Sequence, residues 1–357
     1  NINLLHLKPT RKSRVLRSVF LILSGTGFAS LLAFARNLVI ARLLSIEDYG
    51  VAVTFALSVS LVEMSSATGL QKLIVQAREG DQSKFQSGMQ AFHLLRGVVA
   101  GSILFLLAEP VATFFHVPEL AWAYMLVAVV PVLRGFEHFD IHRYTRRRAY
   151  MPLLLYKVAS IALALAAVWP LAIVFNDYRT MLFSLLLQHA AGTALSHITA
   201  ERRYRLNFDI AVMRHALGFG WPLLLNNALL FFVMQGDRII VGREMGLALL
   251  AIFSMGLTLT MTPMGIIAQS NSLFFLPRLS AARNNRQRFQ HLSRASMQAP
   301  MLAGLVMVLV VATVGDRLVE LLLGEKYDSL GPLIMWFAVW QAARGFRSGC
   351  VQIAISI

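Results

Sequence analysis

Ten long apolar stretches alternate with short polar connections along this chain of 357 residues. An α-helix needs about 20 mainly apolar residues to cross roughly 30 Å of hydrocarbon, and each stretch approaches or exceeds that length. The stretches are residues 18–43, 51–75, 92–108, 119–140, 152–175, 180–199, 216–242, 247–276, 297–314 and 330–353. The pattern predicts an all-α, polytopic transmembrane bundle of about ten helices.

Two of these stretches have unusual ends. The first combines a basic leader, an apolar run and Ala33-Phe34-Ala35, which is also the pattern of a cleavable secretory signal. We interpret it as a retained helix, because the apolar run continues to Leu44 and the helix takes part in an internal repeat. In the third stretch, Glu109-Pro110 would interrupt a span that continues to Phe115.

Composition supports a membrane protein. Hydrophobic residue types make up 57% of the chain and charged types only 14%, whereas a soluble domain carries about 25% charged residues. The formal net charge of +15 could indicate nucleic acid, but the basic residues lie in short clusters between the apolar stretches, so we expect no nucleic-acid partner. The single cysteine, Cys350, excludes a disulfide framework and any site with several thiolates.

The basic residues also predict an orientation, because cytoplasmic connections of membrane proteins are enriched in lysine and arginine. With the N-terminus inside, the inner connections hold 21 basic residues and the outer ones hold five. The outer five are Arg42, Arg179, Arg243, Arg317 and Lys326. We therefore expect a multi-pass protein of the cytoplasmic (inner) membrane with a cytoplasmic N-terminus, whose basic clusters contact anionic membrane lipid.

Two local similarities indicate an internal repeat. Asn37 and Asp237 occupy similar apolar frames 200 positions apart, and Arg-Gly-Phe at 134–136 recurs at 344–346. Six stretches precede the second copy, so both units run in the same direction, which is the parallel type of transporter repeat. We expect an N-terminal lobe, residues 1–205, and a C-terminal lobe, residues 206–357. The second lobe has four stretches where six are expected, so we interpret the chain as part of a longer protein.

Charged residues inside a bilayer usually face a cavity or a partner, because their burial in hydrocarbon is costly. Arg36 lies about two-thirds of the way along the first stretch, close to one stripe with Gly25, Ala29 and Ala33 at helical spacing. Such a stripe is typical of a helix that lines a cavity; close helix packing, with Arg36 reaching outward, is the alternative. We expect Arg36 to face a cavity, with Asn37 beside it as a coupling or structural partner.

Three further sites carry charge into the first lobe. Glu63, near the middle of the second stretch, could neutralise Arg36 or carry a coupling proton, and we favour the structural role. Arg134, Glu137 and His138 share one helix face, and Lys157 lies early in the fifth stretch. Arg134 and Lys157 either line a cationic cavity or extend toward the membrane surface.

The seventh stretch carries Asn226 and Asp237 on one face, with Asn227 and Arg238 beside them. The adjacent Asp237 and Arg238 either neutralise each other or contact a ligand. Our candidate substrate-binding set is Arg36, Arg134, Lys157 and Arg238, and our candidate coupling or structural partners are Glu63, Asn37 and Asp237.

The sequence contains little that indicates catalysis. His138 and His142 have the i, i+4 spacing of metal ligands, but a convincing third ligand is missing, so we expect neither a metal site nor a cofactor. We find no phosphate-binding loop of the Walker type and no serine-elbow motif. The outer connections are short, so we expect a protein that is not an enzyme.

At several places the sequence resembles a known family. Residues 36–50 (Arg-Asn-Leu-Val-Ile-Ala-Arg-Leu-Leu-Ser-Ile-Glu-Asp-Tyr-Gly) resemble the first helix and loop of polysaccharide transporters, the Wzx-like oligosaccharide flippases. Gly69-Leu70 with Leu73-Ile-Val-Gln76 is similar to the end of their second helix. Phe219-Gly-Trp-Pro222 and Asp237-Arg-Ile-Ile-Val-Gly242 are similar to the start of their second lobe.

The resemblance implies membership of the multidrug/oligosaccharidyl-lipid/polysaccharide (MOP) superfamily, whose members have 12 or 14 helices in two lobes around a central cavity. It implies a flippase that moves undecaprenyl-pyrophosphate-linked oligosaccharide to the outer leaflet by alternating access, for O-antigen or exopolysaccharide synthesis. A polymerase and other polysaccharide-assembly proteins would then be partners. Related lipid II flippases carry an Arg-Asp pair in the first helix; Arg36 matches the arginine, but Asn37 replaces the acid, which weakens any inference about the cargo.

Three other functions stay open on the sequence. A multidrug or cation antiporter of the same superfamily would need an acidic cavity, for which Glu63 alone is thin support. A membrane-bound glycan ligase or transferase would need a long outer loop with catalytic residues. A non-transporting assembly subunit would not move lipid when purified.

Overall fold

The computed structural model describes residues 11–147 and 149–356, and these residues are helical almost throughout, with no strand among them. In this described part of the chain, fourteen α-helices are joined by short connections and by short segments of 3-10 and π helix. The first seven are α1 (Arg11–Leu43), α2 (Ile46–Ser65), α3 (Leu70–Gln76), α4 (Ser83–Leu106), α5 (Ala108–Phe114), α6 (Ala121–Val127) and α7 (Val129–Gly135). The others are α8 (Asp140–Arg146), α9 (Met151–Phe175), α10 (Arg179–Ile198), α11 (Ile210–Ile240), α12 (Leu247–Ala281), α13 (Arg286–Leu323) and α14 (Gly331–Ser356). The fold class predicted from the sequence is confirmed.

The ten predicted spans each coincide with helix. Seven match segments that are long and apolar enough to cross a membrane, and an eighth matches α2 and α3 taken together, which are bent by 40° at their junction. The last two match α10 and α14, which have 20 and 26 residues but are less apolar. Both helices pack against longer neighbours, α10 against α9 and α14 against α13.

Local sequence explains where several helices begin or end. The Ser45 hydroxyl accepts a hydrogen bond from the Asp48 N–H (3.0 Å) and so caps the start of α2. Gly69 lies at the junction of α2 and α3 with φ +67°, a conformation that glycine adopts without strain. The predicted interruption near Glu109-Pro110 is confirmed, because α4 ends at Leu106 and the short α5 begins at Ala108.

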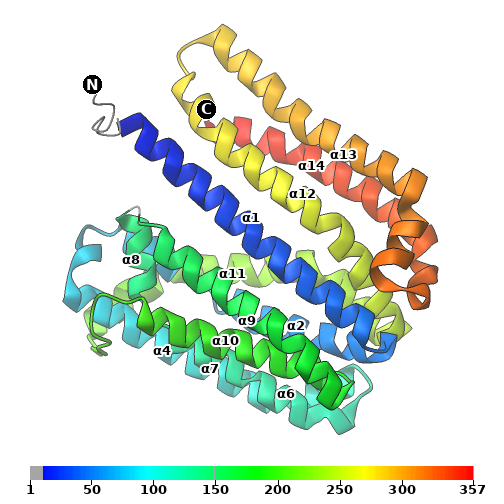
Figure 1. Cartoon of the computed structure of the whole chain (residues 1–357). Helices are drawn as coiled ribbons and strands as arrows, with labels where there is room; N and C mark the ends of the chain where they lie inside the picture. The colour runs from blue at the N-terminus through cyan, green and yellow to red at the C-terminus, as the bar shows by residue number, and fades with distance from the viewer. Residues whose placement is uncertain (1–10, 148, 357) are drawn as a thin grey trace, which may run out of the picture.

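The long helices lie side by side in two groups, with α1 between them (Figure 1). One group holds α4, α6, α7, α9 and α10, and the other holds α12, α13 and α14. α1 contacts α9 on one side and α12 on the other, and α2 also packs against α12. α11 packs mainly against α2 and α4. Helices from both predicted lobes therefore meet along the middle of the molecule.

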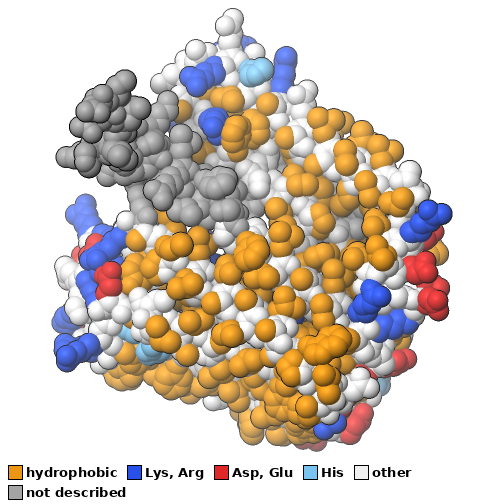
Figure 2. All heavy atoms as spheres, viewed as in Figure 1, with side chains coloured by type: hydrophobic (Ala, Val, Ile, Leu, Met, Phe, Trp, Pro, Cys, Tyr) orange, Lys and Arg blue, Asp and Glu red, His pale blue; other side chains and the backbone are white. Residues whose placement is uncertain are grey.

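Charge and apolar surface are separated along the helix axes. Figure 2 shows hydrophobic side chains over the middle of one face and charged side chains gathered at two opposite ends. Large apolar side chains point outward from several helices: Trp169, Ile173, Val233 and Trp336 are 63–74% exposed. Such a surface is a liability in water but matches acyl chains. We name the end that carries the connections around residues 77–82, 136–150, 199–209 and 282–285 the basic end, and the other end the opposite end.

Close helix crossings fix the first group. A Cβ on Gly97 of α4 would lie 2.6 Å from the Pro131 carbonyl oxygen and 2.7 Å from the Gly135 Cα of α7. The two backbones approach so closely that a side chain has no room there. α2 and α12 cross similarly at Gly50, whose Cβ would meet the Leu247 carbonyl. These crossings hold rigid walls around the polar interior of the bundle.

Candidate functional site

Two adjoining cavities lie inside the bundle on the side of the basic end. Their volumes are about 390 and 490 Å³, and Gln71, Lys72 and Arg134 line both of them. The first cavity also has Glu63, His93, Arg96, Asn226 and Asn227 on its wall. The second also has Glu137, His142, Tyr156 and Lys157. The polar side chains come from α2, α3, α4, α7, α8, α9 and α11, so the cavities depend on helices of the first group and on α11, and α12, α13 and α14 do not line them.

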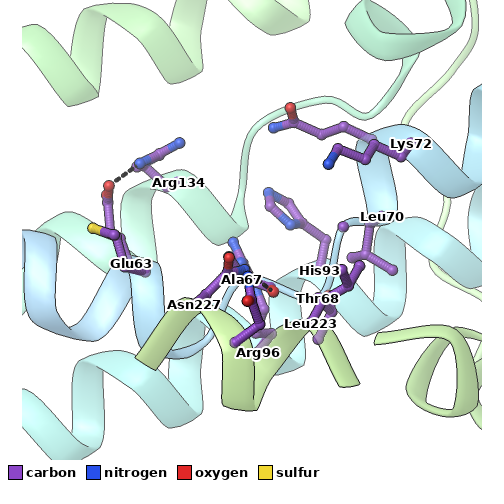
Figure 3. A pocket seen from close by; sticks show the side chains of 14 residues that line it. Glu63, Ala67, Thr68, Leu70, Lys72, His93, Arg96, Arg134, Leu223 and Asn227 are labelled. Carbon is purple, nitrogen blue, oxygen red and sulfur yellow. Dashed lines mark hydrogen bonds and ion pairs between the residues drawn. The ribbon is translucent and has the colours of Figure 1, made fainter. Parts of the chain in front are cut away.

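Arg134 is the central charged group of this site. Its Nη1 forms an ion pair with the Glu63 carboxylate (Figure 3), and its Nε lies 3.9 Å from Glu137 Oε1. The Tyr156 hydroxyl donates to the same Glu137 oxygen at 2.6 Å. One cation thus bridges carboxylates from α2 and from the segment after α7, with α9 attached through Tyr156.

Positive charge exceeds negative charge around the two cavities. Lys72, Arg96, Arg134 and Lys157 contribute four cations, and Glu63 and Glu137 contribute two carboxylates. Because charges interact more strongly in a protein interior than in water, the excess makes the cavities attractive to an anion. Arginine presents a planar set of donors that matches phosphate oxygens.

The break between α2 and α3 forms part of the wall. Helix breaks within a membrane are tolerated where the freed backbone groups line a cavity or find partners. Here the Arg96 Nη1 donates to the Ser66 carbonyl at 3.2 Å, and the Asn227 amide donates to the Ala67 carbonyl at 3.0 Å. Side chains of α4 and α11 therefore stabilise the broken span.

Arg36 lies in the protein interior and does not face acyl chains. Its side chain is 7% exposed, and its Nη1 donates to the amide oxygen of Gln188 on α10. It is not among the residues that line the two cationic cavities. The partner considered for it was Glu63, but that carboxylate pairs with Arg134 of α7.

The other candidates lie nearer the opposite end. Asn37 and Arg238 line a separate cavity of about 110 Å³, with Tyr49 and Gln235. Arg238 Nη1 donates to Gln235 Oε1 at 3.0 Å, and its backbone N–H donates to Asp237 Oδ1 at 2.8 Å. The structure thus brings Arg134 and Lys157 to one region, and places Arg238 in another.

Sequence reasoning missed several wall residues. Arg96 lies inside the third predicted span and its charge alone could have identified it. Lys72 lies in the second predicted stretch and was not among our candidates, but the short α3 places it on the wall of both cavities. His93 and Tyr156 carry no sequence signal that separates them from ordinary packing residues. His142 lines the second cavity, and no three His, Cys, Asp or Glu side chains of the described chain come together as a metal site would require.

The opposite end of the bundle is closed. A buried cluster there includes Ile40, Tyr49, Val168, Leu250 and Leu323, so it joins α1 and α2 to helices of both groups. Lys326 Nζ donates to the carbonyl of Arg42 at 2.9 Å and also to that of Leu44. Apolar packing and these hydrogen bonds join the end of α1 to the connection between α13 and α14.

Outside the spans, a buried ion pair ties the connections at the basic end together. The Asp140 carboxylate binds Arg143 and accepts from the backbone N–H groups of Glu201 (2.9 Å) and Arg202 (3.2 Å). Burial favours the neutral form of Asp140, but the donors outweigh that effect and hold its pKa below the usual value. The connection after α10 is thereby fixed to α8.

Comparison with known proteins gives consistent similarities. The model of a family described as "Polysaccharide biosynthesis protein" matches residues 39–332. The amylovoran biosynthesis protein AmsL of Erwinia amylovora is 23% identical over 284 residues, which are 77% of this chain and 72% of AmsL. The succinoglycan biosynthesis transport protein ExoT of Rhizobium meliloti (strain 1021) is 23% identical over 292 residues, which are 80% of this chain and 58% of ExoT.

Solved structures show the same fold at lower sequence identity. The lipid II flippase MurJ in an inward closed conformation aligns with a TM-score of 0.69 at 13% identity, over 94% of this chain and 79% of MurJ. An inward-facing multidrug transporter of the MATE family in the MOP superfamily aligns with a TM-score of 0.66 at 13% identity, over 92% of this chain and 83% of that transporter. The chain therefore has the MOP fold.

Proposed function

Because the chain belongs to the polysaccharide biosynthesis protein family, we propose that it is a flippase for undecaprenyl-pyrophosphate-linked oligosaccharide. It moves this lipid from the inner to the outer leaflet of the cytoplasmic membrane for O-antigen or exopolysaccharide synthesis. The observation that supports this most directly is the excess of positive charge around two cavities inside a membrane bundle. The relatives are named for amylovoran biosynthesis and for succinoglycan biosynthesis transport.

The physical reason is the charge of the cargo. A pyrophosphate group cannot enter hydrocarbon without a large loss of hydration energy. Lys72, Arg96, Arg134 and Lys157 replace part of that hydration with fixed cations. Arg36 and Arg238 add positive charge in the neighbouring interior. Arg36 is held there by its hydrogen bond to Gln188 of α10, and Arg238 lines a smaller cavity with Asn37. Asp237 accepts from the Arg238 backbone and serves a structural role.

Alternating access fits the way the bundle is closed. The cationic cavities lie toward the basic end, and the apolar cluster with Lys326 closes the opposite end. Basic connections are typical of the cytoplasmic side, so the cavities would load from the inner leaflet. Residues 1–205 and 206–357 would then move relative to each other, and opening would separate α1 from the α13–α14 connection.

The pairing of Glu63 favours a flippase over a cation antiporter. A carboxylate that binds drug cations or coupling ions must be available to them, and Glu63 is already neutralised by Arg134. The cavities also carry more cations than carboxylates. These features are not those of a cation site, and no bond-making chemistry is needed for lipid transfer.

The test is lipid flipping by the purified protein in vesicles. A fluorescent undecaprenyl-pyrophosphate oligosaccharide is placed in both leaflets, and a membrane-impermeant reductant reports which molecules reach the outside. We expect Arg134→Gln to reduce flipping strongly. Arg288→Gln serves as the control, because Arg288 is an exposed arginine at the basic end. Equal flipping by protein-free vesicles, or full activity in Arg134→Gln, would contradict the proposal.

A further inference from the structure

A long apolar groove lies beside the first cationic cavity, between α2, α4 and α11. Its volume is about 500 Å³, and its walls are almost entirely apolar. Along α4 the wall includes Leu95, Val99 and Ile103, which are 46–49% exposed, and Leu217 of α11 also lines the groove with 49% exposure. The groove is therefore open along the outer surface of the bundle, where acyl chains would lie.

The groove and the polar cavity meet at two residues. Arg96 and Thr68 line both of them. Gly220 of α11 packs on Thr68 so closely that a Cβ would lie 2.6 Å away from it, which holds α11 against the break between α2 and α3. A ligand could thus place one part among apolar side chains and another part among charges without leaving the protein.

Arg96 is held at this junction with donor capacity left over. Its Nη1 donates to the Ser66 carbonyl at 3.2 Å, and its Nε is buried with no hydrogen-bond partner. Buried donors are usually satisfied, so an unpaired guanidinium nitrogen at the end of an apolar groove indicates a missing acceptor. Figure 3 shows Arg96 beside Ala67 and Asn227 on the same side of the cavity.

We propose that this groove binds the first isoprene units of a polyprenyl chain whose phosphate lies beside Arg96. The inference rests on the proposed function and assigns the lipid part of the cargo to a site. In a polyprenyl phosphate an apolar chain is attached directly to an anion. The site has the same arrangement, because the apolar groove adjoins the cationic cavity at Arg96.

The depth of Arg96 decides between lipid classes. It is the 14th residue of α4, so it lies about 20 Å along the helix from Ser83 at the basic end. A resident phospholipid keeps its headgroup at the membrane surface, far from this position. A lipid phosphate that is being carried across the bilayer must pass through this depth, so a polyprenyl phosphate in transit fits better than a bulk phospholipid.

Site-directed photo-crosslinking tests the site with matched positions. Cys350, the chain's single cysteine, is first replaced by serine. A benzophenone is then attached at Val99→Cys in the groove or at Val98→Cys. Val98 is the adjacent residue, is 41% exposed and lines none of the cavities described above. The probe is radiolabelled undecaprenyl monophosphate in vesicles of phosphatidylethanolamine and phosphatidylglycerol.

We expect saturable labelling at position 99 and only weak, non-saturable labelling at position 98. Excess unlabelled undecaprenyl phosphate should compete, whereas undecaprenol and additional phosphatidylglycerol should not. Arg96→Gln should lower the labelling several-fold, and Arg96→Lys should retain most of it. Equal labelling at both positions, competition by undecaprenol alone, or competition by phosphatidylglycerol would each overturn the assignment.

A transport measurement separates this inference from the proposed function. Val99→Trp fills the groove, and Val98→Trp is its control. Excluding even two methylene groups of the chain corresponds to about a tenfold loss of affinity, so flipping at low substrate should fall by about that factor only in Val99→Trp. If the parent protein flips the lipid and Val99→Trp is as active as the parent at low substrate, the groove assignment fails and the flippase stands. If labelling is specific but the parent flips nothing, the function fails.

Discussion

The ion pair between Arg134 and Glu63 allows structure and transport to be tested separately. Arg134 is 30% exposed and Glu63 is 26% exposed, so the pair is neither fully buried nor freely hydrated. At an effective dielectric constant near 20, two charges about 4 Å apart attract by about 4 kcal/mol. Removing one member of a buried pair typically costs about 3–5 kcal/mol, because the other charge stays unpaired.

The magnitude expected for Arg134→Met lies at the lower end of that range, because water reaches both side chains. We expect the free energy of unfolding to fall by about 3 kcal/mol. Glu63→Gln should cost less, about 1–2 kcal/mol, because Arg134 still has Glu137 at 3.9 Å. In the double variant the unpaired charge is removed, so part of the stability should return, with a coupling energy of about 1–2 kcal/mol.

The assay measures both properties on the same four proteins. Unfolding by sodium dodecyl sulfate in mixed micelles gives the stabilities, and flipping of fluorescent undecaprenyl-pyrophosphate oligosaccharide in vesicles gives the activities. If Arg134 binds the pyrophosphate, the double variant should regain stability but not flipping. A double variant that flips as fast as the parent would refute a binding role for Arg134. An Arg134→Met protein as stable as the parent would refute the electrostatic reasoning.

Three further outcomes follow from the geometry. Gly97→Ala should destabilise the bundle by about 1–3 kcal/mol, because its Cβ would meet Pro131 and Gly135 backbone atoms, whereas Gly265→Ala, which meets nothing within 4 Å, should be neutral or stabilising in the same unfolding measurement. Asp140→Asn should cost about 3 kcal/mol at neutral pH. The pKa of Asp140 is lower in the folded protein than in the unfolded chain, so its carboxylate stabilises the fold fully at pH values above the unfolded pKa. That stabilisation is lost as the pH falls from the unfolded pKa, about 4, through the folded pKa. Over this pH range the free energy of unfolding should therefore fall less in Asp140→Asn than in the parent. Lys326→Met should loosen the opposite end, because it removes the hydrogen bonds from Lys326 to the end of α1. A cysteine placed at Ile40 should then react faster with an impermeant thiol reagent. The control is Arg317→Met, an exposed change at the same end, which should leave that reaction rate unaltered.

Much of the fold could be predicted because membrane helices are recognised by length and hydropathy. The break after α4 followed from Glu109-Pro110, and the ten spans followed from the apolar stretches. The bend between α2 and α3 was not predicted, because the apolar stretch 51–75 continues through it. Gly69 permits the bend, and tertiary contacts stabilise it: Arg96 and Asn227 donate to the freed carbonyls of Ser66 and Ala67.

The site was predictable only in part. Arg134 and Lys157 were recognised as charged residues inside spans, and the structure places both at the cavities. Partner choice could not be predicted, because Glu63 reaches Arg134 only after α2 and α7 are packed. Arg36 is buried as its position suggested, but its contact with Gln188 depends on how α1 rotates against α10.

The recurrence of Arg-Gly-Phe shows which part of the repeat is structural. Gly135 lies where α4 and α7 cross, and Gly345 lies where α14 contacts Met264 and Pro300. Both glycines permit a close helix contact, so packing explains their recurrence. The arginines differ: Arg134 pairs with Glu63, whereas Arg344 lies 4.9 Å over the Trp340 ring. If the common element is the helix crossing, exchanging the charge of Arg344 should change transport far less than exchanging that of Arg134, because only Arg134 lies on the wall of the cationic cavities.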